Sequence, residues 1–255
     1  MKELLANLLV VALLVSGCAM GSGEASKERS KSGSEQPSNV YVIFDPTIAL
    51  EGQGDRSAML GGVAERVRSS LRENARLTLF VVGTGVFRDP PVFNQKIQEQ
   101  HGTAWERRLR EEQDKILTSL VAAAEGAWSE RQSLDSRIPT SCLLTALARV
   151  EEDLHSGVNG EGRSIVFLVT DLMEACGEWG RFVNLERGIG ELDSFRETSP
   201  EMNLRGVEEV VVLHVGNSPF VTPTEVRELR EAWREVFERS GVPRESLRIV
   251  SHLSY

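Results

Sequence analysis

The run Val40-Tyr41-Val42-Ile43-Phe44, followed by Asp45-Pro46-Thr47-Ile48-Ala49, is the stretch that decides the fold. Five apolar residues in succession predict a strand that is covered on both faces, as the strands of parallel sheets are. In an open sheet of this kind, ligands bind beyond the carboxyl ends of the strands, where the strand order reverses. Because Asp45 directly follows the strand, we expect its carboxylate to lie at this binding edge.

Similar apolar runs recur along the chain and alternate with segments of helical periodicity. The expected strands are 77–82, 165–169, 210–215 and 247–252, and the expected helices are 58–71, 141–154 and 225–239. This alternation predicts an α/β fold with a doubly wound, mainly parallel sheet flanked by helices. Residues 87–132 are expected to form a helical insertion, and residues 182–204 a loop with a short helix.

Four aromatic residues belong to the expected helices. Trp233 and Phe237 are four residues apart on one helix and are expected to pack in the core. Trp105 and Trp128 bracket the helical pattern of the insertion. They either pack between helices or serve as exposed anchors for a partner, since aromatic residues are enriched at interface hot spots.

The first 17 residues have the features of a secretory signal. Met1-Lys2-Glu3 precedes the apolar stretch 4–15, which is too short for a stable membrane span. Val15-Ser16-Gly17-Cys18 resembles the lipobox of bacterial lipoproteins, which implies cleavage before Cys18 and lipidation of that residue. The expected location is the periplasmic face of a membrane, the outer one in a Gram-negative cell. The alternative is ordinary signal cleavage that leaves Cys18 unmodified.

Residues 18–38 are expected to form a flexible tether between the lipid and a domain that spans residues 39–255. The tether is rich in Ser, Gly, Lys and Glu and has almost no large apolar side chain, so it cannot bury enough surface to order itself. A coil of about 20 residues holds the domain roughly 25 Å from its anchor.

The charge of the chain limits its partners. The formal net charge is −9, and removing residues 1–17 leaves it unchanged because that segment has one Lys and one Glu. Such a charge argues against nucleic acid, and against a membrane surface bound through a basic patch. The four histidines show no zinc-ligand spacing. With Cys18 assigned to the lipid, Cys142 and Cys176 remain, either as a disulfide or as two buried thiols.

Asp45 and Thr47 follow the first strand, Thr140 lies just before a helix and Asp171 ends a later strand, and this order resembles that of the von Willebrand factor A domain family. Asp45 and Thr47 match the first positions of the Asp-x-Ser-x-Ser motif, Thr140 matches the later Thr, and Asp171 matches the last acidic position. In the family these positions form a metal-ion-dependent adhesion site. The resemblance implies that they bind Mg²⁺ or Mn²⁺, and that Cys142 and Cys176 lie on the same rim. Ala49 replaces the second Ser and offers no oxygen, so the site is degenerate.

The resemblance implies a non-enzymatic protein that binds a protein partner, in part through the cation. One alternative is an exported hydrolase of the haloacid-dehalogenase type with Asp45 as nucleophile. Thr47 stands where that family has its acid/base Asp, and a Thr hydroxyl has no suitable pKa for proton transfer. The other alternative is a metal-free scaffold whose contacts are made by residues 87–132.

Overall fold

The computed structural model describes nine stretches of the chain, all of which belong to one compact unit, Gln36–Tyr255. The stretches are residues 38–48, 53–82, 90–133, 141–156, 162–174, 183–184, 188–189, 192–214 and 222–251. The expected signal segment, Cys18, the tether up to residue 37, Ala49, Thr140 and Cys176 lie outside them. None of the helices described here has the length and apolar character needed to cross a membrane.

Six strands form one sheet in the order β3-β2-β1-β4-β7-β8, and all neighbours are parallel except β2 and β3. The strands are β1 (Ser38–Phe44), β2 (Arg76–Val81), β3 (Phe93–Lys96), β4 (Arg163–Thr170), β7 (Val207–His214) and β8 (Leu247–Ser251). A separate antiparallel pair consists of β5 (Val183–Asn184) and β6 (Gly188–Ile189). The chain therefore has the predicted α/β fold, and its strand order reverses between β1 and β4.

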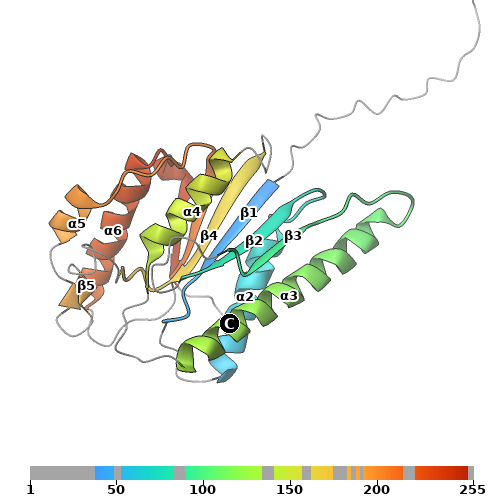
Figure 1. The fold of residues 1–255 in the computed structure, drawn as a ribbon, viewed down its shortest axis with the longest axis horizontal. Helices are drawn as coiled ribbons and strands as arrows, with labels where there is room; N and C mark the ends of the chain where they lie inside the picture. The colour runs from blue at the N-terminus through green and yellow to red at the C-terminus, as the bar shows by residue number, and fades with distance from the viewer. Residues whose placement is uncertain are drawn as a thin grey trace, which may run out of the picture. The chain divides into compact units, whose positions relative to one another are not determined.

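Helices cover both faces of the sheet (Figure 1). They are α2 (Gln53–Arg68), α3 (Trp105–Ser133), α4 (Leu143–His155), α5 (Leu192–Thr198) and α6 (Pro223–Arg239), with a 3₁₀ turn, η2, at Arg244–Ser246. Successive side chains of a strand point to opposite faces. Accordingly Val40, Val42 and Phe44 of β1 pack with α2 and α3, whereas Tyr41 and Ile43 pack with α4 and α6.

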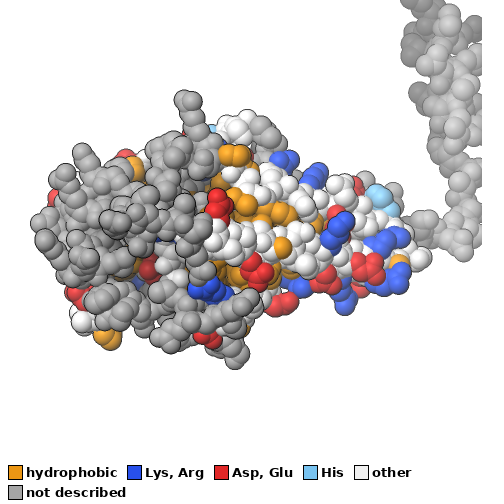
Figure 2. All heavy atoms as spheres, turned by 60° about the horizontal axis from the view of Figure 1, so that its bottom comes forward, with side chains coloured by type: hydrophobic (Ala, Val, Ile, Leu, Met, Phe, Trp, Pro, Cys, Tyr) orange, Lys and Arg blue, Asp and Glu red, His pale blue; other side chains and the backbone are white. Residues whose placement is uncertain are grey.

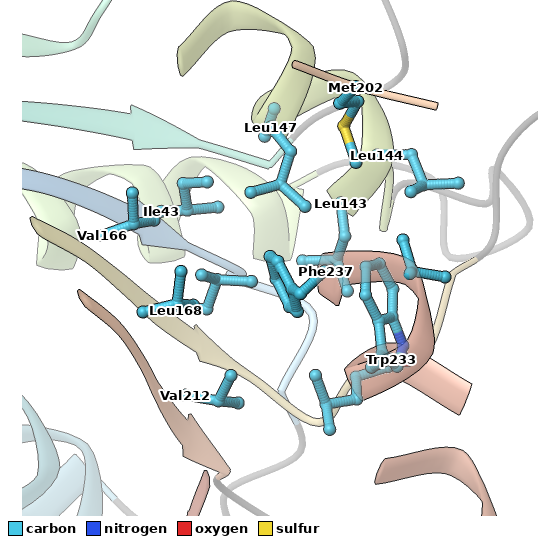
Figure 3. Packing of buried hydrophobic residues seen from close by; sticks show 14 of the residues in the cluster. Ile43, Leu143, Leu144, Leu147, Val166, Leu168, Met202, Val212, Trp233 and Phe237 are labelled. Carbon is cyan, nitrogen blue, oxygen red and sulfur yellow. Dashed lines mark hydrogen bonds between the residues drawn. The ribbon is translucent and has the colours of Figure 1, made fainter. Parts of the chain in front are cut away.

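The core between the sheet and α6 contains the aromatic pair expected from the sequence. Trp233 and Phe237 are fully buried, with ring centroids 5.9 Å apart, which confirms the prediction of core packing. Figure 3 shows both rings among Leu143, Leu168 and Val212, which come from α4, β4 and β7. The helix begins with a capping box in which Thr222 and Glu225 satisfy each other's backbone amides.

Residues 90–133 contain an edge strand, β3, that the sequence did not predict, and one long helix, α3, that covers the helical pattern expected between Trp105 and Trp128. β3 lies at the edge of the sheet, where a strand pairs on one side only. Such a strand can be short and polar, and the sequence of β3 has no apolar run. The helix α3 packs against α2 and the sheet, and its Trp128 is buried against Phe44, with ring centroids 5.5 Å apart. Trp105, in contrast, is 43% exposed.

Candidate functional site

Asp45 lies at the point where the strand order reverses. Its amide donates to the carbonyl of Val169, the last residue of β4 that pairs with β1 (2.9 Å). Thr170 and Asp171 follow Val169, so they lie beside Asp45 at the carboxyl edge of the sheet. This is the position at which open α/β sheets bind ligands.

The carboxylate of Asp45 is fully buried and accepts four hydrogen bonds. Oδ1 accepts from the amide and the hydroxyl of Thr47, at 2.9 and 2.6 Å. Oδ2 accepts from the hydroxyls of Ser141 and Thr170, at 2.6 and 3.3 Å. Asp45, Thr47, Ser141, Thr170 and Asp171 are called the Asp45 site below.

These bonds determine what each oxygen of the Asp45 site can still do. An ionised carboxylate has about four lone-pair positions, and four donors occupy those of Asp45. A hydroxyl has one proton and two lone pairs. Thr47 and Ser141 give their protons to Asp45, so the lone pairs of both hydroxyls remain for a ligand. Asp45 is therefore suited to orient ligand oxygens, and less to bind a cation directly.

Burial changes the protonation of both acids. It raises the pKa of Asp45 above the usual aspartate value, although hydrogen bonds from Ser141 and Thr47 oppose the shift. Burial, and after it the charge of Asp45, raises the pKa of Asp171 to about 7. A bound cation would favour the ionised form of both groups, because an opposite charge nearby lowers the pKa of an acid.

The loop after β4 holds Asp171 in place. Oδ1 of Asp171 accepts from the amide of Met173 (2.9 Å), and the hydroxyl of Thr170 accepts from the amide of Leu172 (2.9 Å). Leu172 has a φ of 68°, which is uncommon for a residue other than glycine. Its carbonyl accepts from the indole N–H of Trp233 (2.8 Å), so α6 supports this strained turn.

A further buried acid, Glu174, joins the same loop to α4. One carboxylate oxygen of Glu174 accepts from the amide of Leu144 in the first turn of α4 (2.9 Å). A negative charge is favourable there because the amides of a first turn have no partner within the helix. Cys142, the N-cap residue, is in a disulfide whose other half lies outside the described residues. Its pairing with Cys176 stays a prediction.

The structure brings together three of the four cation ligands expected from the sequence. Asp45, Thr47 and Asp171 meet in the Asp45 site, whereas Thr140 lies outside the described residues. Sequence reasoning missed Ser141 and Thr170. Each is adjacent to an expected ligand, in the pairs Thr140-Ser141 and Thr170-Asp171, and pattern alone does not say which residue of a pair faces Asp45.

The oxygens of the Asp45 site suit a hard divalent cation. Mg²⁺ and Mn²⁺ prefer carboxylate, hydroxyl and water ligands, and Mg²⁺ usually takes one or two carboxylates and several waters. The hydroxyls of Thr47 and Ser141 and the carboxylate of Asp171 are ligands of this kind. Across the stretches that the structure describes, no group of three or more His, Cys, Asp or Glu residues is arranged for a metal. Hydroxyls and water would therefore supply most of the ligands.

Comparisons with known proteins concern the fold. No protein-family profile and no curated protein match the chain. Among solved structures it is similar to a von Willebrand factor type A protein from Catenulispora acidiphila (13% identity, TM-score 0.38), covering 86% of this chain and 39% of that one. It is also similar to an aerotolerance-related membrane protein from Bacteroides fragilis, with 12% identity and a TM-score of 0.37, and this match covers 84% of this chain and 92% of that one. A third similar structure is the manganese-loaded TRAP protein of Plasmodium vivax, with 15% identity and a TM-score of 0.37, and this match covers 85% of this chain and 69% of that one.

The chain thus spans about two fifths of the Catenulispora structure. These are likenesses of fold, and the first of them is to a von Willebrand factor type A protein. The α/β fold itself follows from the strand order and the helices on both faces of the sheet.

Proposed function

We propose that the protein is an exported lipoprotein, anchored through Cys18, whose α/β domain binds a protein partner at the carboxyl edge of the sheet. A divalent cation, Mg²⁺ or Mn²⁺, takes part in this contact. Thr47, Ser141 and Asp171 are its ligands in the described part of the chain, and Thr140 is a further ligand expected from the family resemblance. Asp45 holds the hydroxyls in place.

The observation that carries this proposal is the set of hydrogen bonds on Asp45. A buried carboxylate is costly unless its acceptors are filled, and here hydroxyls from the loop after β1, the residue before the N-cap of α4 and the end of β4 fill them. Three separate elements therefore present oxygen atoms around one charge, at the ligand-binding edge of the sheet. Packing alone does not require hydroxyls at these positions.

The same geometry disfavours the hydrolase alternative. A carboxylate nucleophile needs a free lone pair and access to its substrate, whereas Asp45 is fully buried and its acceptors are occupied. Thr47, at the place of an acid/base residue, donates to Asp45 and offers no group that titrates near neutral pH. Binding without covalent chemistry is the function that this site supports best.

Calorimetric titration of Mg²⁺ and Mn²⁺ into the chain from Cys18 onward tests the cation. We expect binding at millimolar concentration or tighter in the wild type, and none in Asp45→Asn, which has one acceptor oxygen fewer for the hydroxyls. Asp193→Asn is the matched control, because it makes the same change on the exposed face of α5. If neither ion binds to the wild type, the metal-free scaffold becomes the better description.

The anchor and the partner are tested in cells. Cys18→Ala is expected to move the protein from the membrane fraction to the soluble fraction. Crosslinking of the anchored protein should capture a partner, and Asp45→Asn should reduce that crosslink while Asp193→Asn leaves it unchanged. Equal crosslinks in both variants would mean that the contact is made elsewhere on the domain.

A further inference from the structure

The helix α3 extends past the sheet at the end opposite the Asp45 site. Asn39, Arg76 and Lys96 are register partners in β1, β2 and β3, and they mark the edge where the parallel strands begin. We call this the amino edge. At the other end of the sheet, Trp128 of α3 packs against Phe44, so the helix runs from the amino edge toward the carboxyl edge.

The first two turns of α3 lie beyond the amino edge. Glu112 is level with it, because its carboxylate accepts from the amide of Gln98 (2.9 Å) and the side chain of Gln100 (2.6 Å), which follow β3 closely. Trp105 is seven residues earlier, and at 1.5 Å per residue it lies roughly 10 Å farther out. Figure 1 shows this end of α3 projecting past the strands.

Trp105 is an unusual side chain for such a position. Together with Val92, at the other end of β3, it is one of two large apolar side chains exposed in the described part of the chain. The residues around it are mixed in charge: residues 105–112 contain three Arg and three Glu. Two pairs of them, Arg107–Glu111 and Arg110–Glu106, form exposed ion pairs on the helix. Figure 2 shows acidic and basic side chains mixed at this end of the domain.

The tether joins the domain at the same edge. β1 begins at Ser38, which pairs with Arg163 at the start of β4, so the chain enters the sheet at the amino edge, the edge past which α3 extends. About 20 residues separate Ser38 from Cys18, which as a coil span roughly 25 Å. A lipid on Cys18 therefore keeps the amino edge, and Trp105 beyond it, close to a membrane.

We propose that Trp105 inserts into the interfacial layer of the phospholipid bilayer to which the protein is anchored. Trp is enriched at this depth because its ring is apolar and its N–H is polar. One such contact is weak on its own, but the tether converts it into an intramolecular event at a high effective concentration. The balanced charge of residues 105–112 means that the contact requires no anionic lipid. The proposal rests on the lipid anchor of the proposed function.

The contact would orient the candidate site. β1 runs from Ser38 at the amino edge to Phe44, and Asp45 follows it. Seven strand residues span about 23 Å. With Trp105 on the bilayer, the Asp45 site faces away from the membrane, toward a partner that approaches from the aqueous side.

Fluorescence quenching by bilayer lipids tests the insertion. The lipidated protein is purified from membranes and reconstituted into phosphatidylcholine vesicles with or without brominated acyl chains, which quench tryptophans at the bilayer. We expect brominated lipid to lower the emission of the wild type, in which Trp105 is one of four tryptophans. Trp105→Phe should abolish this loss, and 0.5 M NaCl should not, because the contact is apolar.

The matched control places a tryptophan at another exposed site. In the double variant Trp105→Phe, Val92→Trp, the new residue lies at the far end of β3, and brominated lipid should leave its emission unchanged. The proposal is overturned if brominated lipid does not quench the anchored wild type, if Trp105→Phe retains the loss, or if salt abolishes it. It is also overturned if Trp105→Phe weakens the crosslink to a protein partner and alters no quenching.

Failure of the anchor itself has a separate readout. If mass spectrometry finds no lipid on Cys18, the proposed membrane anchor and the insertion of Trp105 are both wrong. If Cys18 is lipidated and Trp105 is not quenched, the insertion alone is wrong, and the proposed function stands.

Discussion

The hydroxyl oxygen of Ser141 lies 2.6 Å from Oδ2 of Asp45, although 96 residues separate the two in the chain. The bond joins the end of β1 to the residue before the N-cap of α4. Together with the bonds from Thr47 and Thr170 it fills the acceptors of a buried carboxylate. The stability of this edge and the arrangement of its oxygens therefore depend on the same few contacts.

Replacing Ser141 with Ala should destabilise the domain and weaken cation binding. Asp45 would lose a donor in a buried place, which costs about 1–3 kcal/mol, and the cation would lose a ligand oxygen. Urea unfolding measures the first effect and calorimetric titration of Mn²⁺ the second. Ser129→Ala, on the exposed face of α3, is the control and should change neither. A variant that keeps wild-type stability would show that water replaces the hydroxyl.

The stability of the metal-free domain should fall as the pH rises from about 4 to about 7. The pKa of Asp171 is raised to about 7 by burial and by the charge of Asp45, whereas in the unfolded chain its proton leaves near the usual value of 3.8. A group whose pKa is higher in the folded state than in the unfolded state stabilises the fold fully when the pH is below its unfolded pKa. This contribution is lost as the pH rises through the folded pKa. Thermal unfolding at several pH values measures this.

Two comparisons make the pH experiment specific. Asp171→Asn should reduce the dependence between pH 4 and 7, because one of the two acids with a raised pKa is gone. Saturating Mn²⁺ should raise the midpoint most near and above pH 7, where the carboxylates are ionised without competition from protons. An unchanged pH profile in Asp171→Asn would assign the titration to another group.

Trp233→Phe should destabilise the turn that follows β4. The indole N–H donates to the carbonyl of Leu172, whose backbone is in the left-handed region, and both residues are buried. Phe keeps most of the packing and leaves the carbonyl without its donor, at a cost of about 1–3 kcal/mol. Urea unfolding measures this cost. Trp105→Phe is the control, because it makes the same change at an exposed position, and it should change the free energy of unfolding by less than about 0.5 kcal/mol. Equal effects of both changes would mean that this bond adds nothing.

Cys142 should be found bonded to Cys176. Mass spectrometry of peptides prepared without reductant identifies the pair directly. Reduction should destabilise the domain by about 2–4 kcal/mol, since the bond closes a loop of some 30 residues. It should also weaken cation binding, because Cys142 directly follows Ser141. A Cys142–Cys18 peptide would contradict both this pairing and lipidation of Cys18.

Much of the fold could be predicted because the apolar runs are local. The strand at Val40–Phe44 and the helix with Trp233 and Phe237 each begin two residues before the expected place and end at the expected residue. β3 could not be predicted, since a short edge strand needs no apolar run and its sequence, Phe-Asn-Gln-Lys, is largely polar. α3, in contrast, begins at Trp105, where the helical pattern was expected to begin, and continues five residues beyond Trp128.

The sequence by itself determined the α/β class and the place of Asp45 after the first strand, because burial on both faces leaves a continuous apolar run. Only the tertiary structure decided that Ser141 and Thr170 donate to Asp45 and that Trp233 supports the turn at Leu172. Those contacts join residues 61 to 125 positions apart, and a shift of one residue in any loop would change them. Their geometry is set by how α4 and α6 pack on the sheet, which no local pattern specifies.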